Sequence, residues 1–137
     1  MTSKVTYTGD LRTLATHLRS GSEIETDAPV DNQGKGERFS PTDLVATALA
    51  SCILTTIGIG SATHNINIDG AECMIEKVMA ANPRRISEIK ADLSFPKSQP
   101  FTAREKQIIE HTARTCPVTQ SLHPDCLITL SFNWPAE

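Results

Sequence analysis

The stretch SPTDLVATALASCILTTIGIGSAT, residues 40–63, decides the fold, because its composition and its first residues predict one long apolar helix. Ser40 is a favourable N-cap residue, and Pro41 suits the first helical position. Asp43 follows Ser40 at the capping-box spacing, with Asp in place of the more usual Glu or Gln. We therefore expect a helix that begins at this cap and ends near Thr63.

The predicted helix is apolar on all of its faces. Leu44, Ala48 and Cys52 follow one another at intervals of four residues and therefore share one face. Further large apolar residues occupy the other faces: Val45, Leu49, Ile53 and Ile57. Such a helix has to be enclosed on all sides, and one small chain supplies little cover, so we expect a homodimer. A membrane span is the poorer interpretation, because the uncharged run 44–60 is short for a bilayer and lacks an aromatic belt or basic flank.

Strand patterns lie on both sides of this helix. The expected elements, in chain order, are strands at 4–8, 11–18 and 23–28, a loop at 29–39, the long helix, strands at about 65–80 (with a break at 69–70) and 85–95, helices at about 102–115 and 117–122, and a strand at 126–133. Strands and helices are segregated in this order rather than alternating. The pattern therefore indicates a single α+β domain over residues 1–137.

The composition excludes several classes of function. Net charge is −3 and the charges are scattered, so no basic stripe for nucleic acid is present in the sequence. One Trp, one Tyr and four Phe leave few platforms on which bases could stack. The first ten residues contain no apolar segment of signal-peptide length, so we expect a cytoplasmic protein whose four cysteines are reduced at rest.

Two of these cysteines lie where thiol chemistry is plausible. Cys116 precedes Pro117 at the start of a short predicted helix, where backbone N–H groups and the helix dipole stabilise a thiolate. Each of Cys52 and Cys116 lies on the core-facing stripe of its helix, so packing of the two helices would bring both sulfurs into one site. For either cysteine alone, a small buried apolar residue is the alternative interpretation. Cys73 and Cys126 are interpreted as structural.

The motifs SPTDLVATALASC and TCPVTQSL together resemble the OsmC/Ohr family of thiol-dependent hydroperoxide reductases, and the order of elements agrees over nearly the whole chain. The resemblance implies an intertwined α+β homodimer, with antiparallel sheets around a long buried central helix. It also implies that Cys52 attacks an organic hydroperoxide and becomes a sulfenic acid, which Cys116 converts to a disulfide. An external dithiol then reduces the disulfide, and no metal, haem or flavin is required.

The resemblance further implies an arginine, oriented by a glutamate, that helps Cys52 to ionise. Cys52 lies about 16 Å from the start of its own helix at 1.5 Å per residue, so that helix dipole does not reach it. Without a cation from another segment, burial should raise its pKa. The usual glutamate position, ten residues before Cys52, is Thr42 in this chain. Arg19, in a turn, is the first candidate for the arginine and Arg38 the second, with a solvated surface arginine as the alternative for each.

Two other functions stay open on the sequence alone. The missing glutamate is compatible with a non-catalytic OsmC-like dimer that binds an apolar ligand or a small electrophile. A second alternative is a zinc-binding module, because four residues offer two imidazoles and two thiolates: His111, Cys116, His123 and Cys126. Their spacing matches no standard zinc motif. His17 could also contact the thiol site if its strand reaches that far.

Overall fold

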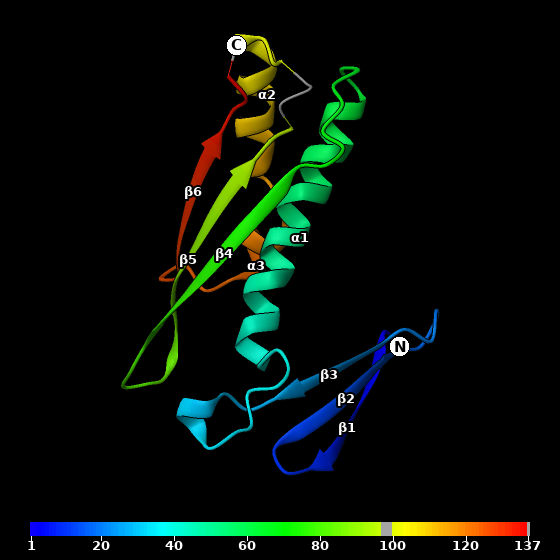
Figure 1. Cartoon of the computed structure of the whole chain (residues 1–137), viewed down its shortest axis with the longest axis vertical. Coiled ribbons are helices and arrows are strands. Elements are labelled where there is room, and N and C mark those ends of the chain that lie inside the picture. Colours follow the sequence, from blue (N-terminus) through cyan, green and yellow to red (C-terminus); the bar gives the residue numbers. More distant parts are fainter. Residues whose placement is uncertain (97–99, 137) are drawn as a thin grey trace. The chain divides into compact units, whose positions relative to one another are not determined.

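The computed structural model describes residues 1–96 and 100–136, and it has the predicted α+β organisation (Figure 1). Its elements are β1 (Ser3–Gly9), β2 (Arg12–His17), β3 (Glu23–Asp27), the short 3-10 helix η1 (Val30–Asn32), α1 (Pro41–Ala62), β4 (Glu72–Ala80), β5 (Arg85–Ser94), α2 (Ala103–Ala113), α3 (Pro117–Ser121) and β6 (Leu127–Asn133). The chain divides into two compact units, and the boundary between Val45 and Ala46 falls inside α1.

The first unit is an antiparallel meander of β1, β2 and β3, as the sequence predicts. Arg12 and Asp27 are direct partners across β2 and β3, and two hydrogen bonds of 2.7 and 2.9 Å join the guanidinium to the carboxylate. The backbone N–H of Glu37 also donates to the Asp27 carboxylate, over 3.1 Å. This one buried carboxylate therefore ties the loop after β3 back onto the sheet.

The predicted capping box at the start of α1 is confirmed. The backbone N–H of Asp43 donates to Ser40 Oγ over 3.0 Å, and the N–H of Ser40 donates to the Asp43 carboxylate over 3.0 Å. Each bond satisfies a backbone donor that the helix itself leaves without a partner. The Thr42 hydroxyl lies 3.2 Å from Ser40 Oγ and therefore belongs to the same cap.

The second unit contains the sheet β4–β5–β6. β4 and β5 pair antiparallel, whereas β5 and β6 pair parallel, with Ile89 opposite Ile128. The expectation of antiparallel sheets therefore fails at this one pair. The reason is the crossover through α2 and α3, which returns the chain to the starting end of β5 and sends β6 in the same direction.

The core of the second unit lies between this sheet and the helices α1 and α2 (Figure 1). β5 shows the predicted alternation, since Ile89, Ala91 and Leu93 are buried while the residues between them face outward. α1 contributes its largest buried side chains, Leu49, Ile53 and Ile57, and α2 contributes Ile109 and Ala113. Burial of one such large aliphatic side chain stabilises the fold by about 1.5–3 kcal/mol.

α1 is not fully enclosed by its own chain. Val45 and Ile59 are 37% and 68% exposed, although both are large and apolar. By length and composition alone α1 could cross a bilayer, but the core helix of a soluble protein meets the same criteria. The packing of its buried stripe against β5 and α2 fits the second description.

The strand expected from about residue 65 begins only at Glu72. The residues between α1 and β4 form local turns instead, because Ser61 O accepts the N–H groups of both His64 and Ile66. A second turn follows at Gly70, whose φ of +84° is a backbone conformation that glycine adopts without strain. Ile66 is nevertheless buried, and so it anchors this connection to the core.

Candidate active site

Cys116 is the N-cap of α3, and its sulfur accepts the hydrogen bonds that a cap must accept. The backbone N–H of Thr119 donates to Cys116 Sγ over 3.3 Å, and the Thr119 hydroxyl lies 3.1 Å from the same sulfur. Pro117 occupies the first helical position, where its missing N–H costs nothing. Cys116 has no exposed surface in the chain, so this sulfur is both hydrogen-bonded and closed to solvent.

Cys52 of α1 meets the same short helix. Burial disfavours its thiolate, but three hydrogen bonds act in the opposite direction: from the backbone N–H of Val118, from the Cys116 thiol and from the Thr56 hydroxyl. Together they hold the pKa of Cys52 below its ordinary value. Cys116 is thus one of the groups that lower the pKa of Cys52, and both residues are free thiols.

The start of α3, rather than the start of α1, acts on Cys52. The N-terminus of α1 is indeed too far from the Cys52 sulfur, but α3 supplies another helix N-terminus from a distant part of the sequence. Val118 is the second residue of α3, and its N–H has no acceptor within the helix. The expectation of a raised pKa in the absence of a cation fails for the same reason, because the groups that lower this pKa are hydrogen-bond donors.

The face of α1 that carries Cys52 differs slightly from the expectation. The stripe buried within the chain is the one that carries Leu49, Ile53 and Ile57, and Cys52 lies beside it, packed on the core but partly exposed. The Thr56 hydroxyl, one turn further along α1, lies 3.8 Å from Cys52 Sγ. A lowered pKa and partial exposure are the conditions under which cysteines tend to be reactive.

The pKa values of the other two cysteines are shifted in the opposite direction. Burial, together with the negative charge of Asp92, raises the pKa of Cys73 to about 11. Burial and the charge of Glu88 likewise raise the pKa of Cys126. Both side chains stay protonated at neutral pH, which agrees with their interpretation as structural residues.

The arginine candidates all lie in the first unit. Arg19 is exposed in the turn between β2 and β3, where His17 Nδ1 lies 2.6 Å from Ser20 Oγ. Arg38 is also exposed, and its Nε lies 3.7 Å from a Glu25 carboxylate oxygen. Both arginines belong to the first unit and Cys52 belongs to the second, so the roles of Arg19 and Arg38 at the thiol site stay predictions.

Arg12 is a third candidate, which the sequence motifs did not single out. Of the three, it is the one whose guanidinium is held by two hydrogen bonds to a buried carboxylate, and Glu37 Oε2 lies a further 3.4 Å from it. The hydrogen bonds to Asp27 raise its already high pKa. The available signal was cross-strand pairing, which places a residue at the start of β2 opposite the last residue of β3.

The zinc alternative is not supported by the geometry. Within residues 1–96 and 100–136, no group of three or more His, Cys, Asp or Glu side chains is arranged to hold a metal ion. His123 Nδ1 instead accepts the backbone N–H of Asp125 over 3.0 Å, and Cys116 is the cap of α3. Within these described residues, the four side chains therefore do not form the hypothesised four-ligand site.

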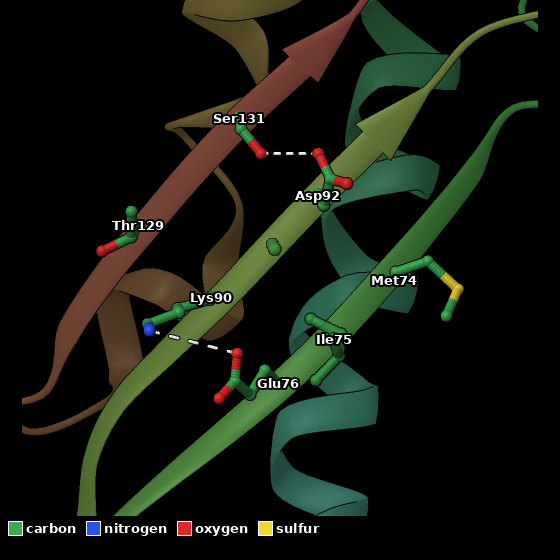
Figure 2. A pocket seen from close by; sticks show the side chains of 8 residues that line it. Met74, Ile75, Glu76, Lys90, Asp92, Thr129 and Ser131 are labelled. Atoms are coloured by element: carbon green, nitrogen blue, oxygen red, sulfur yellow. Dashed lines mark hydrogen bonds and ion pairs between the residues drawn. The ribbon is translucent and has the colours of Figure 1, made fainter.

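A pocket of about 440 Å³ lies on the outer face of the second sheet, away from the core (Figure 2). Its polar side chains already pair with one another: Lys90 Nζ lies 4.0 Å from Glu76 Oε2, and Ser131 Oγ donates to Asp92 over 2.6 Å. Neither Cys52 nor Cys116 lines it. The thiol pair therefore remains the candidate active site.

These features place the chain in a known class. A sequence model described as OsmC-like protein matches residues 34–131, a span that contains both cysteines and most of the second unit. The chain therefore belongs to the OsmC/Ohr family of OsmC-like proteins, as its two motifs indicate. No curated protein matches the chain.

Solved structures agree with this assignment. A candidate osmotic stress induced and detoxification response protein from Psychrobacter arcticus 273-4 shares 54% identity, with a TM-score of 0.92 over 97% of this chain and 96% of that one. An OsmC-like protein from Mycoplasma pneumoniae has 18% identity and a TM-score of 0.81, with 98% and 96% covered. An organic hydroperoxide resistance protein OsmC from Legionella pneumophila has 15% identity and a TM-score of 0.76, with 97% of each chain covered. The two distant proteins show the shared fold.

Proposed function

We propose that this protein is a thiol-dependent hydroperoxide reductase that uses Cys52 and Cys116 and needs no metal, haem or flavin. The observation that carries the proposal is the environment of the two thiols at the start of α3: the Thr119 N–H donates to Cys116 Sγ, and the Val118 backbone and the Cys116 side chain help to lower the pKa of Cys52. Family membership supports it, as does the likeness of the fold to a protein named for organic hydroperoxide resistance.

The reaction begins with the Cys52 thiolate, which attacks one oxygen of the peroxide O–O bond. That bond breaks, the alcohol leaves after taking a proton, and Cys52 becomes a sulfenic acid. The Cys116 sulfur then attacks the Cys52 sulfur, water leaves, and a disulfide joins the two residues. An external dithiol restores both thiols and is itself oxidised to a disulfide.

The arginine contribution is a separate part of the proposal. Arg19 and Arg38 remain the candidates that the sequence favoured, and Arg12 joins them because Asp27 already fixes its guanidinium. Thr42 offers a hydroxyl to the α1 cap rather than a carboxylate to an arginine. We propose that Asp27 and Glu37 do the work of the absent glutamate if Arg12 is the activating cation.

The assembly is proposed to be a homodimer in the cytoplasm. Val45 and Ile59 on α1 leave apolar surface that one chain does not cover. A reducing compartment suits a cycle that begins and ends with free thiols. The dimer should survive dilution and dissociate only on unfolding, and light scattering across a dilution series measures this; a folded, monodisperse monomer would contradict it.

The deciding experiment is steady-state peroxide reduction with a small dithiol, comparing an organic hydroperoxide with hydrogen peroxide. The wild-type chain should consume the organic hydroperoxide, Cys52→Ser should be inactive, and Cys73→Ser is the matched control that should retain activity. Stoichiometric hydroperoxide should also yield a 52–116 disulfide, detected by peptide mass mapping. Peroxide consumption with both thiols still free would refute the two-cysteine mechanism.

The missing glutamate favours one competing function, a non-catalytic dimer that binds an apolar ligand or a small electrophile. The same assay separates the two. If hydroperoxide is not consumed while Cys52 still reacts with electrophiles such as iodoacetamide, the binding function replaces the enzyme. Equal hydroperoxide consumption by wild type and Cys52→Ser would assign the activity elsewhere and exclude both roles for this thiol.

A further inference from the structure

We propose that an external thiol opens the Cys52–Cys116 disulfide by attacking the sulfur of Cys52, and that Thr119 stabilises the departing Cys116 sulfur. The inference rests on the proposed function, because it concerns the reductive half of the same cycle. It assigns a direction to that step and a positioning role to a residue that does not touch the peroxide.

Access to the two sulfurs differs. Cys116 has no exposed surface, whereas Cys52 is partly exposed beside the buried stripe of α1. A thiolate must reach the sulfur that it attacks, so access decides which sulfur reacts. A partner subunit can only reduce exposure further, and so it cannot open Cys116 to an external thiol.

Two hydrogen-bonding groups of Thr119 already surround Cys116 Sγ, the sulfur that would leave. Around Cys116 Sγ, the Thr119 N–H lies at 3.3 Å and the Thr119 hydroxyl at 3.1 Å. Hydrogen bonds to an ionised acceptor are stronger than those to a neutral one, so both contacts strengthen as negative charge develops on this sulfur. A thiol that is more acidic leaves faster from a disulfide.

The step balances as a two-electron transfer. The thiolate of the reductant forms a new S–S bond with Cys52, and the electron pair of the old S–S bond goes to Cys116, which takes up a proton. The second thiol of the dithiol then attacks the first sulfur of the same reductant, which is bound to Cys52 in the mixed disulfide. Cys52 leaves as a thiolate, and the reductant is released as a disulfide.

The test uses a Cys73→Ser/Cys126→Ser background, in which only the two site cysteines remain. The disulfide is made with diamide, so its formation does not depend on peroxide chemistry. Brief treatment with 2-mercaptoethanol, acid quenching, alkylation and peptide mass mapping then locate the adduct. We expect the mercaptoethanol adduct on Cys52 and the alkyl group on Cys116. The reverse placement would overturn the inference, and so would failure of diamide to form the 52–116 disulfide.

Variants of Thr119 test the leaving-group role. Thr119→Val keeps the N–H and the shape but removes the hydroxyl, and should slow disulfide opening about three- to tenfold. Thr119→Ser should restore the rate. Thr115→Val is the matched control, because the Thr115 hydroxyl donates to Thr112 O over 2.7 Å, and this variant should open at the wild-type rate. An unchanged rate in Thr119→Val, or an equal loss in Thr119→Ser, would contradict the role.

The two proposals can fail separately. A chain that consumes no hydroperoxide but opens its diamide-made disulfide at Cys52 would refute the proposed function and leave the direction of opening intact. A chain that consumes hydroperoxide but carries the adduct on Cys116 would leave the proposed function intact and refute the direction of opening.

Discussion

Arg12 and Asp27 face one another across β2 and β3, and Arg12 Nε lies 2.7 Å from Asp27 Oδ1. The Asp27 side chain is only 1% exposed, so water hardly solvates its charge, and the carboxylate depends on Arg12 for compensation. The same carboxylate accepts the Glu37 N–H, which joins the sheet to the loop before α1. The pair therefore joins β2 to β3 and, through Glu37, to the loop before α1.

Asp27→Asn should destabilise the protein at neutral pH more than Glu37→Gln does. The substitution removes a buried charge and leaves the Arg12 guanidinium without its main partner, whereas the Glu37 side chain is 58% exposed. Urea unfolding of the two variants measures the difference. Equal midpoints for Asp27→Asn and wild type would show that the pair contributes nothing to stability.

The same pair predicts a pH dependence. The Arg12 hydrogen bond, working against the burial of the carboxylate, lowers the pKa of Asp27 in the folded protein below its ordinary value of about 3.9. Its stabilising contribution is therefore present above that ordinary value and is lost as pH falls through the folded-state pKa. The unfolding midpoint of wild type should fall more steeply below about pH 4 than that of Asp27→Asn. Parallel pH profiles would contradict this.

The Cys52 thiol should ionise at lower pH than an ordinary cysteine, because donors of α3 and Thr56 outweigh its burial. In a variant that lacks the other three cysteines, the Cys116 contribution is absent, so the profile reports the Val118 N–H and the Thr56 hydroxyl. Thr56→Val should shift iodoacetamide labelling of Cys52 to higher pH, and Thr56→Ser should restore it. Identical pH profiles for all three proteins would remove Thr56 from the site.

Arginine variants test the cation separately. If one arginine of the first unit supports the thiolate, then Arg12→Ala, Arg19→Ala or Arg38→Ala should shift the Cys52 labelling profile further to higher pH. We expect the shift in at least one variant, and circular dichroism checks that each remains folded. No shift in any of the three would leave α3 and Thr56 as the whole source of activation.

Two glycines near the end of α1 should respond in opposite ways to alanine. A Cβ at Gly58 would have only ordinary contact, 3.9 Å from Ile68 Cδ1, so Gly58→Ala should stabilise the helix by about 0.5–1 kcal/mol. A Cβ at Gly60 would lie 2.9 Å from Thr112 Cγ2, and overpacking of this kind costs about 1–3 kcal/mol. Gly60→Ala should therefore destabilise the protein, and adding Thr112→Ala should recover the loss. A stabilising Gly60→Ala would show that α1 and α2 separate easily.

The sequence predicted those parts of the structure that local patterns determine. The α1 cap followed from Ser40 and Asp43, and the buried face of β5 followed from strict alternation. It failed where contacts join distant segments. The parallel direction of β6 depends on the path of a crossover, and the Val118 N–H belongs to a backbone that carries no side-chain signal.

Cys52 and Cys116 could be singled out as a candidate pair because each lies in its own motif, but the groups that lower the pKa of Cys52 could not be predicted. The sequence shows only charges and the dipole of α1 near Cys52, and on these alone an arginine is required. The role of Thr119 could not be predicted either, because a threonine at the third position of a short helix usually has no more than a structural role. Its importance becomes visible only when Cys116 is seen as the cap.

Backbone support of a thiolate has a consequence for the response to salt. A cation at a solvent-accessible site attracts a thiolate through a field that dissolved ions screen within about 8–10 Å at 0.1–0.15 M ionic strength. The Val118 N–H is neutral and acts on Cys52 as a short-range hydrogen-bond donor, so dissolved salt screens its effect much less than that of a distant charge. The part of Cys52 reactivity that α3 supplies should therefore persist in concentrated electrolyte, whereas the part that an arginine supplies should fall as salt is added.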